Sequence, residues 1–134
     1  EGLPAAVRAA LSRALQRTRG NTGMQLNLAL NYGGRLELVH AFRTLARRVL
    51  AGELAPDAID EAAVSGALYT GGMPDPDLLI RPSGEMRLSN FLPWQTVYTE
   101  IYFATDVFWP DFRRQHLYAA IAEYQRRQRR FGGA

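Results

Sequence analysis

Apolar residues recur every three or four positions in several stretches of the chain, which predicts amphipathic helices. One helix is predicted over residues 4–19, and a second begins at Leu36 and ends at Gly52. A shorter helix is predicted over residues 56–67. The last helix is predicted to start at residues 109–111, and its inward-facing residues would be Phe112, Leu117, Ile121 and Tyr124.

Three other stretches predict β-strands. Residues 24–30 begin with alternating apolar and polar side chains, and residues 77–81 form a short apolar run between turn signals. Residues 98–103 are the third candidate. Strands that alternate with helices predict an α/β fold, with a parallel sheet surrounded by helices. Because two or three strands make a thin sheet, we expect an incomplete domain whose remaining strands come from elsewhere.

Composition narrows the class of protein. The chain has 134 residues, which predicts one domain or one piece of a larger domain, and it contains no cysteine for disulfides or thiol chemistry. No apolar run is long enough to span a membrane, and we expect a cytoplasmic protein. The first residue is Glu1 rather than methionine, so we expect the chain to begin within a longer protein.

The positive charge is carried entirely by arginine. The formal net charge is +3, and all 16 of the lysine and arginine positions are arginine. Together with the many alanines, this composition indicates a GC-rich coding sequence more than a nucleic-acid surface. The densest run, residues 126–130, is interpreted as a solvated helix end whose cations suit the helix dipole.

Polar side chains gather just after the strand predicted at residues 77–81. In open parallel sheets, ligands bind beyond the carboxyl ends of the strands, where Arg81, Arg87 and Ser89 would lie. Guanidinium groups match phosphate oxygens two at a time, and the turn at residues 83–84 would add backbone N–H groups. The alternative is two surface arginines paired with Glu85, and spacing by itself favours that simpler interpretation.

Glu100 is the one charged residue in an apolar stretch, residues 97–103. Either it points outward from a half-exposed strand, or it faces inward to hold a cation. Mg²⁺ is commonly bound by one or two carboxylates together with ligand phosphates, so a glutamate beside a diphosphate site would suit it. The two histidines, His40 and His116, are far apart in sequence and are interpreted as structural or exposed.

Four segments carry a resemblance to a known family: "LNLALNYGGR", "DLLIRPSGEMRLSNFLPWQTVYTEIYF", "WPDF" and "RRFGG". The chain resembles, over essentially its whole length, the C-terminal half of a cis-prenyltransferase of the undecaprenyl diphosphate synthase type. The resemblance implies that residues 1–134 are the C-terminal part of one such domain, without its N-terminal strands. It also implies condensation of isopentenyl diphosphate with an allylic prenyl diphosphate to make a polyprenyl diphosphate, the class of lipid carrier used in cell-wall synthesis.

The same resemblance implies a cofactor, a partner and individual roles. The enzyme would use Mg²⁺, form a homodimer and contact the membrane surface transiently to deliver its lipid product. The implied isopentenyl diphosphate ligands and their ordering residue are Arg81, Arg87, Ser89 and Glu85. Glu100 would be a Mg²⁺ ligand, and Arg130 belongs to an R-x-G tail that reaches an active site across the dimer interface.

One family motif is absent from this sequence. Family members carry an Asp-Gly-Asn-Arg-like motif in their first half, whose aspartate serves Mg²⁺ and the allylic diphosphate, and no such segment occurs here. We therefore expect no catalytic residue and no turnover in the isolated chain. Two alternatives remain: a non-catalytic partner subunit of a heteromeric prenyltransferase, and a generic phosphate-binding or nucleic-acid-binding module.

Overall fold

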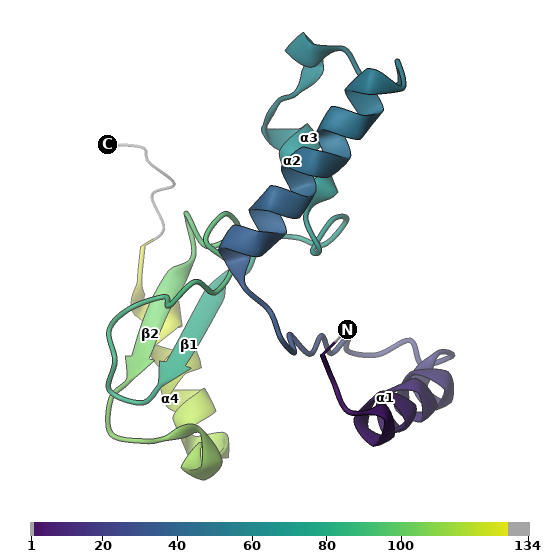
Figure 1. Ribbon diagram of the computed structural model, residues 1–134. Helices are drawn as coiled ribbons and strands as arrows, with labels where there is room; N and C mark the ends of the chain where they lie inside the picture. Colours follow the sequence, from purple (N-terminus) through teal and green to yellow (C-terminus); the bar gives the residue numbers. More distant parts are fainter. Residues whose placement is uncertain (1, 129–134) are drawn as a thin grey trace. The chain divides into compact units, whose positions relative to one another are not determined.

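The computed structural model of the protein describes residues 2–128 and contains two compact units, Glu1–Tyr32 and Gly33–Ala134, which are described separately. The first unit contains helix α1 (Ala5–Thr18), as predicted over residues 4–19 (Figure 1). The strand predicted at residues 24–30 is wrong, because these residues form neither helix nor strand. A strand requires a hydrogen-bonded neighbour, and the sheet formed by the described residues contains only two strands, both in the second unit. The apolar residues of the predicted strand are exposed instead, including Met24, Leu26 and Leu28.

The sheet of the second unit consists of β1 (Leu78–Pro82) and β2 (Glu100–Ala104), which run parallel. The register places Leu78 opposite Glu100 and Arg81 opposite Phe103. Both strands were predicted within two residues of their observed bounds, and the parallel α/β arrangement is confirmed. Because parallel strands begin at the same end of a sheet, the chain must return from the end of β1 to the start of β2, and residues 83–99 make this connection.

Two of the predicted helices begin later than expected. The region 56–67 is not one helix but a 3₁₀ turn, η1 (Pro56–Ala58), followed by α3 (Glu61–Ala67). The break occurs because the Asp60 side chain accepts a hydrogen bond from the backbone N–H of Ala63 at 2.8 Å, and therefore caps α3. Likewise η2 (Trp109–Asp111) is separate from α4 (Arg114–Arg126).

Two small apolar clusters hold the second unit together. Helix α2 (Gly34–Leu50) packs on α3, and α4 packs on β2 beside the sheet (Figure 1). The buried residues of the first cluster are Ala41, Leu45, Val64 and Leu68, and those of the second are Ala104, Val107 and Ala120. The prediction that Leu117 and Ile121 face inward is wrong, because α4 presents the small Ala120 to the sheet and leaves them 40% and 38% exposed. None of the helices between residues 2 and 128 has the length and apolar character needed to cross a bilayer.

The β1–β2 connection is fastened to the start of α2. The N–H of Gly34 donates to the Asn90 carbonyl at 2.9 Å, and the N–H of Arg35 donates to the Asn90 side-chain oxygen at 2.9 Å. These bonds satisfy two of the N–H groups that the first turn of a helix leaves without partners. Gly34 is required by this contact, since a Cβ at that position would overlap the ring of Pro93.

Buried polar groups make a second connection between the same segments. Glu37 of α2 is 1% exposed and Gln95 is 3% exposed. The Gln95 Nε2 group donates to Glu37 Oε1 at 3.2 Å and to Thr70 Oγ1 at 2.9 Å. The N–H of Tyr69 also donates to Glu37 Oε1, at 2.9 Å. The Glu37 carboxylate therefore joins α2, the segment after α3 and the β1–β2 connection.

We predict that Gly34→Ala lowers the free energy of unfolding by roughly 1–3 kcal/mol, because the added methyl group displaces Pro93 and disturbs the Asn90 contact. Urea unfolding followed by circular dichroism measures the change. Gly66→Ala in α3 is the matched control, since nothing lies within 4 Å of a Cβ at that position. The control should be neutral or stabilise by up to about 1 kcal/mol through helix propensity. Equal effects of the two substitutions would contradict the packing argument.

Candidate functional site

Four polar residues form a hydrogen-bonded cluster at the carboxyl end of β1. We call Arg81, Glu85, Arg87 and Ser89 the arginine cluster. Glu85 forms ion pairs with both Arg81 and Arg87, one through each carboxylate oxygen. Arg81 Nη1 also donates to Ser89 Oγ at 3.0 Å and to the Arg87 carbonyl. The structure therefore brings together the four residues that the sequence singled out, and it also contains the Glu85 pairing that the simpler interpretation required.

The two arginines of the cluster differ in what they can offer a ligand. The Arg81 side chain is 18% exposed, and both of its terminal nitrogens are engaged within the cluster. The Arg87 side chain is 65% exposed, and its contact in the cluster uses Nη2. Because Ser89 Oγ accepts from Arg81, its own hydroxyl hydrogen can still be donated. Arg81 thus orders the connection, whereas Arg87 and Ser89 present donors outward.

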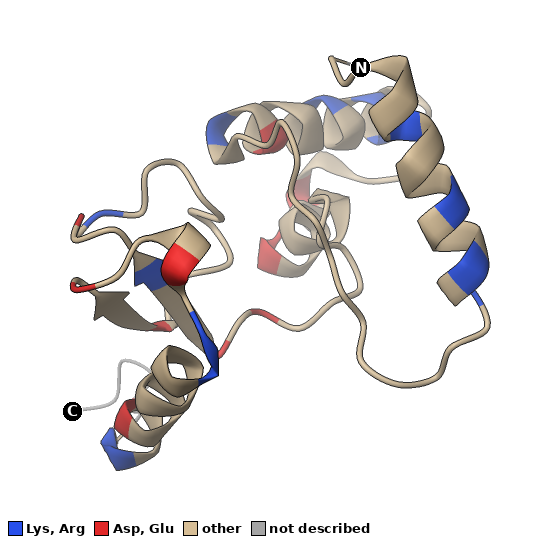
Figure 2. Cartoon of the chain, turned by 90° about the horizontal axis from the view of Figure 1, so that it is seen from below, with Lys and Arg blue, Asp and Glu red and all other residues tan. Residues whose placement is uncertain are grey.

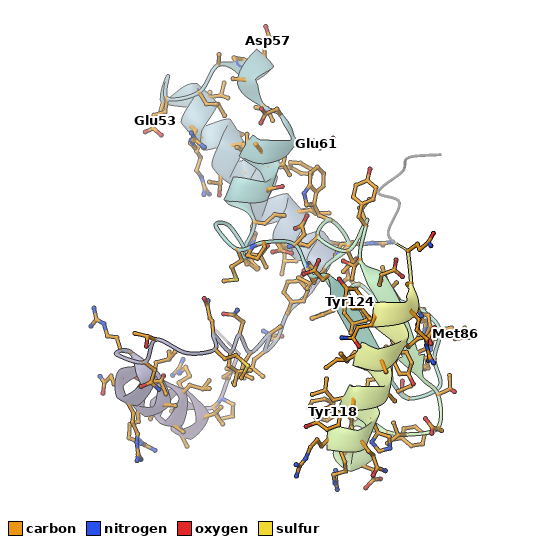
Figure 3. All side chains as sticks on the ribbon, turned by 180° about the vertical axis from the view of Figure 1, so that it is seen from behind. Glu53, Asp57, Glu61, Met86, Tyr118 and Tyr124 are labelled. Atoms are coloured by element: carbon orange, nitrogen blue, oxygen red, sulfur yellow. The ribbon has the colours of Figure 1, made fainter. Side chains whose placement is uncertain are left out.

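The backbone around the cluster is unusual. Ser89, Asn90 and Leu92 have φ angles of 49°, 67° and 46°, in the left-handed region that non-glycine residues seldom adopt. Met86, between Glu85 and Arg87, is 73% exposed at the outer side of the connection (Figure 3). Left-handed residues persist where surrounding contacts hold them, which here are the Arg81 bond to Ser89 and the Asn90 contact with α2.

One predicted anion donor is not available. The turn at residues 83–84 was expected to present backbone N–H groups, but the N–H of Ser83 donates to the Val107 carbonyl at 2.9 Å. This bond ties the end of β1 to the segment after β2. The expectation is therefore wrong for Ser83.

Glu100 forms an ion pair that the sequence did not reveal. Arg127, directly after the last residue of α4, donates from Nη1 to Glu100 Oε2 at 2.8 Å and to the Ile101 carbonyl at 3.0 Å. The Arg127 and Glu100 side chains are only 30% and 25% exposed. Positively and negatively charged positions accordingly lie together near the C-terminal end of α4 (Figure 2). Arg127 is thus not the solvated helix end that was predicted for residues 126–130.

The ion pairs shift two ionisation equilibria. The hydrogen bond from Arg127 to Glu100 is the main reason that the pKa of Arg127 lies above its ordinary value. The hydrogen bond from Arg126 to Glu123, at 2.7 Å, is the main reason that the pKa of Glu123 lies below its ordinary value. Both shifts favour the charged forms, so the end of α4 remains a network of alternating charges.

Glu100 does not lie beside the arginine cluster within this chain. It is opposite Leu78 in the register, three residues before Arg81, and three residues of strand cover about 10 Å. Successive side chains of a strand point to opposite faces of the sheet. The Arg81 side chain therefore projects from one face, and the side chains of Leu78 and Glu100 project from the other.

Glu100 therefore provides one carboxylate, whose Oε2 atom already accepts from Arg127. Between residues 2 and 128 there is no group of three or more histidine, aspartate or glutamate side chains that could hold a metal ion. These residues do not form a Mg²⁺ site by themselves. They fit Mg²⁺ only as a single ligand, completed by phosphate oxygens or by other carboxylates.

The sequence did not predict the contacts of three residues, Arg127, Glu37 and Gln95. Arg127 lies 27 residues from Glu100, and no periodic pattern connects them. The buried Glu37–Gln95 contact was signalled only by a glutamate on the apolar side of its helix. Arg130, predicted to belong to a tail that crosses the dimer interface, lies outside the described residues.

Three comparisons place this architecture among known proteins. The family described as "Putative undecaprenyl diphosphate synthase" matches residues 1–132. The isoprenyl transferase of Geobacillus kaustophilus is 56% identical over 133 residues, which are 99% of this chain and 51% of that protein. The isoprenyl transferase of Heliobacterium mobile is 55% identical over 133 residues, with the same shares of both chains. The chain thus spans about half the length of these relatives.

Two solved structures match the fold. Lavandulyl diphosphate synthase from Lavandula x intermedia, in complex with dimethylallyl diphosphate, matches with a TM-score of 0.92 and 46% identity. The match covers 98% of this chain and 56% of that one. A probable undecaprenyl diphosphate synthase from Campylobacter jejuni matches with a TM-score of 0.75 and 32% identity, covering 98% of this chain and 58% of that one.

We predict that Arg127→Gln lowers the free energy of unfolding by roughly 1–2 kcal/mol, because Glu100 loses the partner of a half-buried ion pair. Urea unfolding of Arg127→Gln, Glu100→Gln and the double variant measures the coupling between the two residues. The double variant should lose less than the sum of the single variants. Arg126→Gln is the control, since its solvent-exposed pair with Glu123 should contribute little to stability. Additive losses would show that the two side chains do not interact.

Proposed function

Because the chain belongs to the undecaprenyl diphosphate synthase family, we propose that it carries the isopentenyl diphosphate part of a cis-prenyltransferase active site. In the proposed reaction, the alkene of isopentenyl diphosphate attacks the allylic carbon of a prenyl diphosphate. A carbon–carbon bond forms, diphosphate leaves the allylic carbon, and a proton is lost from the acceptor. The product is a longer prenyl diphosphate whose new double bond is cis.

The arginine cluster is the observation that carries this proposal. A diphosphate bears several negative charges, and guanidinium groups offer paired donors that match its oxygens. Arg87 and Ser89 present their donors outward, so we assign them to direct contact with the diphosphate of isopentenyl diphosphate. Arg81 and Glu85 are assigned as positioning residues, because their contacts lie within the cluster. Holding the acceptor in place supports a reaction between two molecules by removing much of its entropic barrier.

Glu100 is proposed as a single Mg²⁺ ligand, consistent with the Mg²⁺ dependence that the family resemblance implies. When bound, Mg²⁺ would neutralise diphosphate charge and so favour departure of the diphosphate group. In this chain the carboxylate of Glu100 is held by Arg127. That ion pair uses Oε2, so the other oxygen, Oε1, would serve the metal ion.

The family resemblance also implies an oligomeric state and a destination for the product. We propose a homodimer in which Arg130 reaches the active site of the partner subunit, and a product that is handed to a membrane surface. A non-catalytic partner subunit is less well supported, because a subunit that only lends its tail has no need of a complete Arg81–Ser89 cluster.

We predict that Arg87→Gln weakens binding of isopentenyl diphosphate by about tenfold or more, since it removes charge-assisted hydrogen bonds to the diphosphate. Isothermal titration calorimetry with the 134-residue chain measures the dissociation constant. Arg114→Gln, at the start of α4, removes the same charge outside the cluster and should leave the constant unchanged. If both substitutions weakened binding equally, the loss would be due to the change in net charge, and the arginine cluster would lose its support as a diphosphate site.

Arg81 and Arg87 should also respond differently to lysine. Arg87→Lys retains the charge facing the ligand and should keep part of the affinity. Arg81→Lys replaces two terminal nitrogens by a single Nζ atom, which matches the positions of Glu85, Ser89 and the Arg87 carbonyl less well, so it should lower thermal stability as well as affinity. If Arg81→Lys left the melting temperature unchanged, its assignment as a positioning residue would be incorrect.

We predict that the 134-residue chain binds isopentenyl diphosphate weakly and does not catalyse prenyl transfer. The reason is that its sequence lacks the aspartate motif that the resemblance assigns to the allylic diphosphate. Radiolabelled isopentenyl diphosphate with an allylic diphosphate and Mg²⁺ provides the assay, and a full-length relative is the positive control. Formation of labelled prenyl product by the purified chain would overturn this prediction.

A further inference from the structure

A pocket on α2 is lined only by polar side chains. It has a volume of about 310 Å³, and its walls are formed by His40, Arg43, Thr44, Arg47 and Tyr69. The first four occupy consecutive turns of α2, and Tyr69 follows α3, so all five belong to the second unit. None of them belongs to the arginine cluster. We call this hollow the α2 pocket.

The two arginines of the α2 pocket lack a counter-ion. Neither the Arg43 nor the Arg47 side chain forms an ion pair or hydrogen bond with another described residue. They are four residues apart on the helix, so their Cβ atoms lie about 6 Å apart and their like charges destabilise α2 slightly. The one acidic residue of α2, Glu37, is buried and accepts hydrogen bonds from Gln95 and Tyr69. Glu37 does not line the pocket.

The rest of the pocket wall is fixed by internal contacts. His40 Nδ1 is hydrogen-bonded to the Tyr69 hydroxyl, and the two rings meet edge to face with centroids 5.9 Å apart. The Thr44 hydroxyl donates to the His40 carbonyl at 3.0 Å. The N–H of Tyr69 donates to the buried Glu37, which holds Tyr69 against α2. The guanidinium groups are thus presented beside a wall whose side chains are already ordered.

Acidic side chains of the helical pair are placed elsewhere. Glu53, Asp57 and Glu61 lie around η1 and the start of α3 (Figure 3). None of them lines the pocket. The pocket is therefore cationic, and its polar lining and small volume favour a compact anion over an apolar ligand.

We propose that the α2 pocket binds a phosphate-class oxyanion through the guanidinium groups of Arg43 and Arg47. Two guanidinium groups one helical turn apart can each donate to a different oxygen of one phosphate group, and the bound anion removes their mutual repulsion. The Nε2 edge of His40, which the Tyr69 contact leaves unused, adds a third polar group on the same side of α2. The phosphate would come from free phosphate or diphosphate in solution, or from the headgroup of an anionic lipid.

Calorimetric titration of the 134-residue chain with inorganic phosphate, and then with inorganic diphosphate, tests the site. Binding should weaken by about tenfold or more in the Arg43→Gln/Arg47→Gln variant, which loses the charge-assisted bonds. The matched control is Arg13→Gln/Arg17→Gln on α1, which removes two exposed arginines at the same spacing. Helix α1 carries basic positions and no acidic ones (Figure 2). The control should bind as the unchanged chain does, and circular dichroism should give the same helix content for all three proteins.

A measurement without any substitution keeps the test independent of folding. The side-chain Nε–H signals of Arg43 and Arg47 should shift in ¹H–¹⁵N NMR spectra on addition of phosphate, while those of Arg13 and Arg17 should not. Unshifted Arg43 and Arg47 signals at saturating phosphate would overturn a free-anion site. Loss of phosphate binding in Arg87→Gln but not in the Arg43/Arg47 variant would assign the anion to the arginine cluster and would also overturn the proposal.

Vesicle sedimentation distinguishes the two sources of phosphate. If a lipid headgroup is the ligand, the chain should sediment with phosphatidylglycerol vesicles but not with phosphatidylcholine vesicles, and the Arg43/Arg47 variant should remain in solution. If free phosphate is the ligand, calorimetry should detect binding and the two kinds of vesicle should behave alike. If neither phosphate binding nor vesicle binding depended on Arg43 and Arg47, the α2 pocket would be rejected as an anion site. Because the variants are different, failure here leaves the isopentenyl diphosphate assignment to be judged on Arg87 alone.

Discussion

Asn90 satisfies two N–H groups at the start of α2, and the position of the candidate site depends on this contact. The first N–H groups of a helix have no partners within it, and here Gly33, the residue before α2, provides no side-chain cap. The carbonyl and the side-chain oxygen of Asn90 accept from Gly34 and Arg35 instead. This requires close approach of the two segments, which a side chain at position 34 would prevent. Ser89 is the neighbour of Asn90, so the same contact fixes one end of the arginine cluster.

Buried polar groups strengthen this arrangement, because losing their hydrogen bonds would cost free energy. An ionised carboxylate buried without partners is strongly unfavourable, and Glu37 is tolerated because it accepts from Gln95 and from the Tyr69 backbone. Displacing the β1–β2 connection from α2 would leave Glu37 with fewer hydrogen bonds, so the apolar packing of α2 on α3 and the arrangement of the cluster are coupled. Tyr69 also contacts His40, and the α2 pocket is consequently held by the same carboxylate.

The spacing of apolar residues along the chain predicted the elements that depend mainly on neighbouring residues. The apolar run before Arg81 predicted β1, and the helical spacing after Leu36 predicted α2. The strand predicted at residues 24–30 failed because pairing depends on a neighbour, which an alternating pattern cannot provide. The break at Asp60 was missed because a capping side chain competes with helix continuation. In the arginine cluster, short sequence separations made both the diphosphate interpretation and the Glu85 pairing foreseeable. The Glu100–Arg127 pair depends on how α4 packs on β2, which no local pattern encodes.

The Glu100–Arg127 pair and a metal at Glu100 would depend on the same carboxylate. Oε2 accepts from Arg127 in the structure, and a cation bound to the same atom would meet the guanidinium charge at close range. Because this half-buried ion pair is partly open to solvent, its contribution to stability is modest, and the negative charge of a diphosphate would attract both Arg127 and the metal ion. Release from Glu100 would not leave Arg127 alone, because Glu123 lies 3.6 Å from its Nε atom and can retain it. Glu123 thus gives Arg127 an alternative partner at the end of α4, and the charge network makes release of Glu100 less costly than breaking an isolated pair.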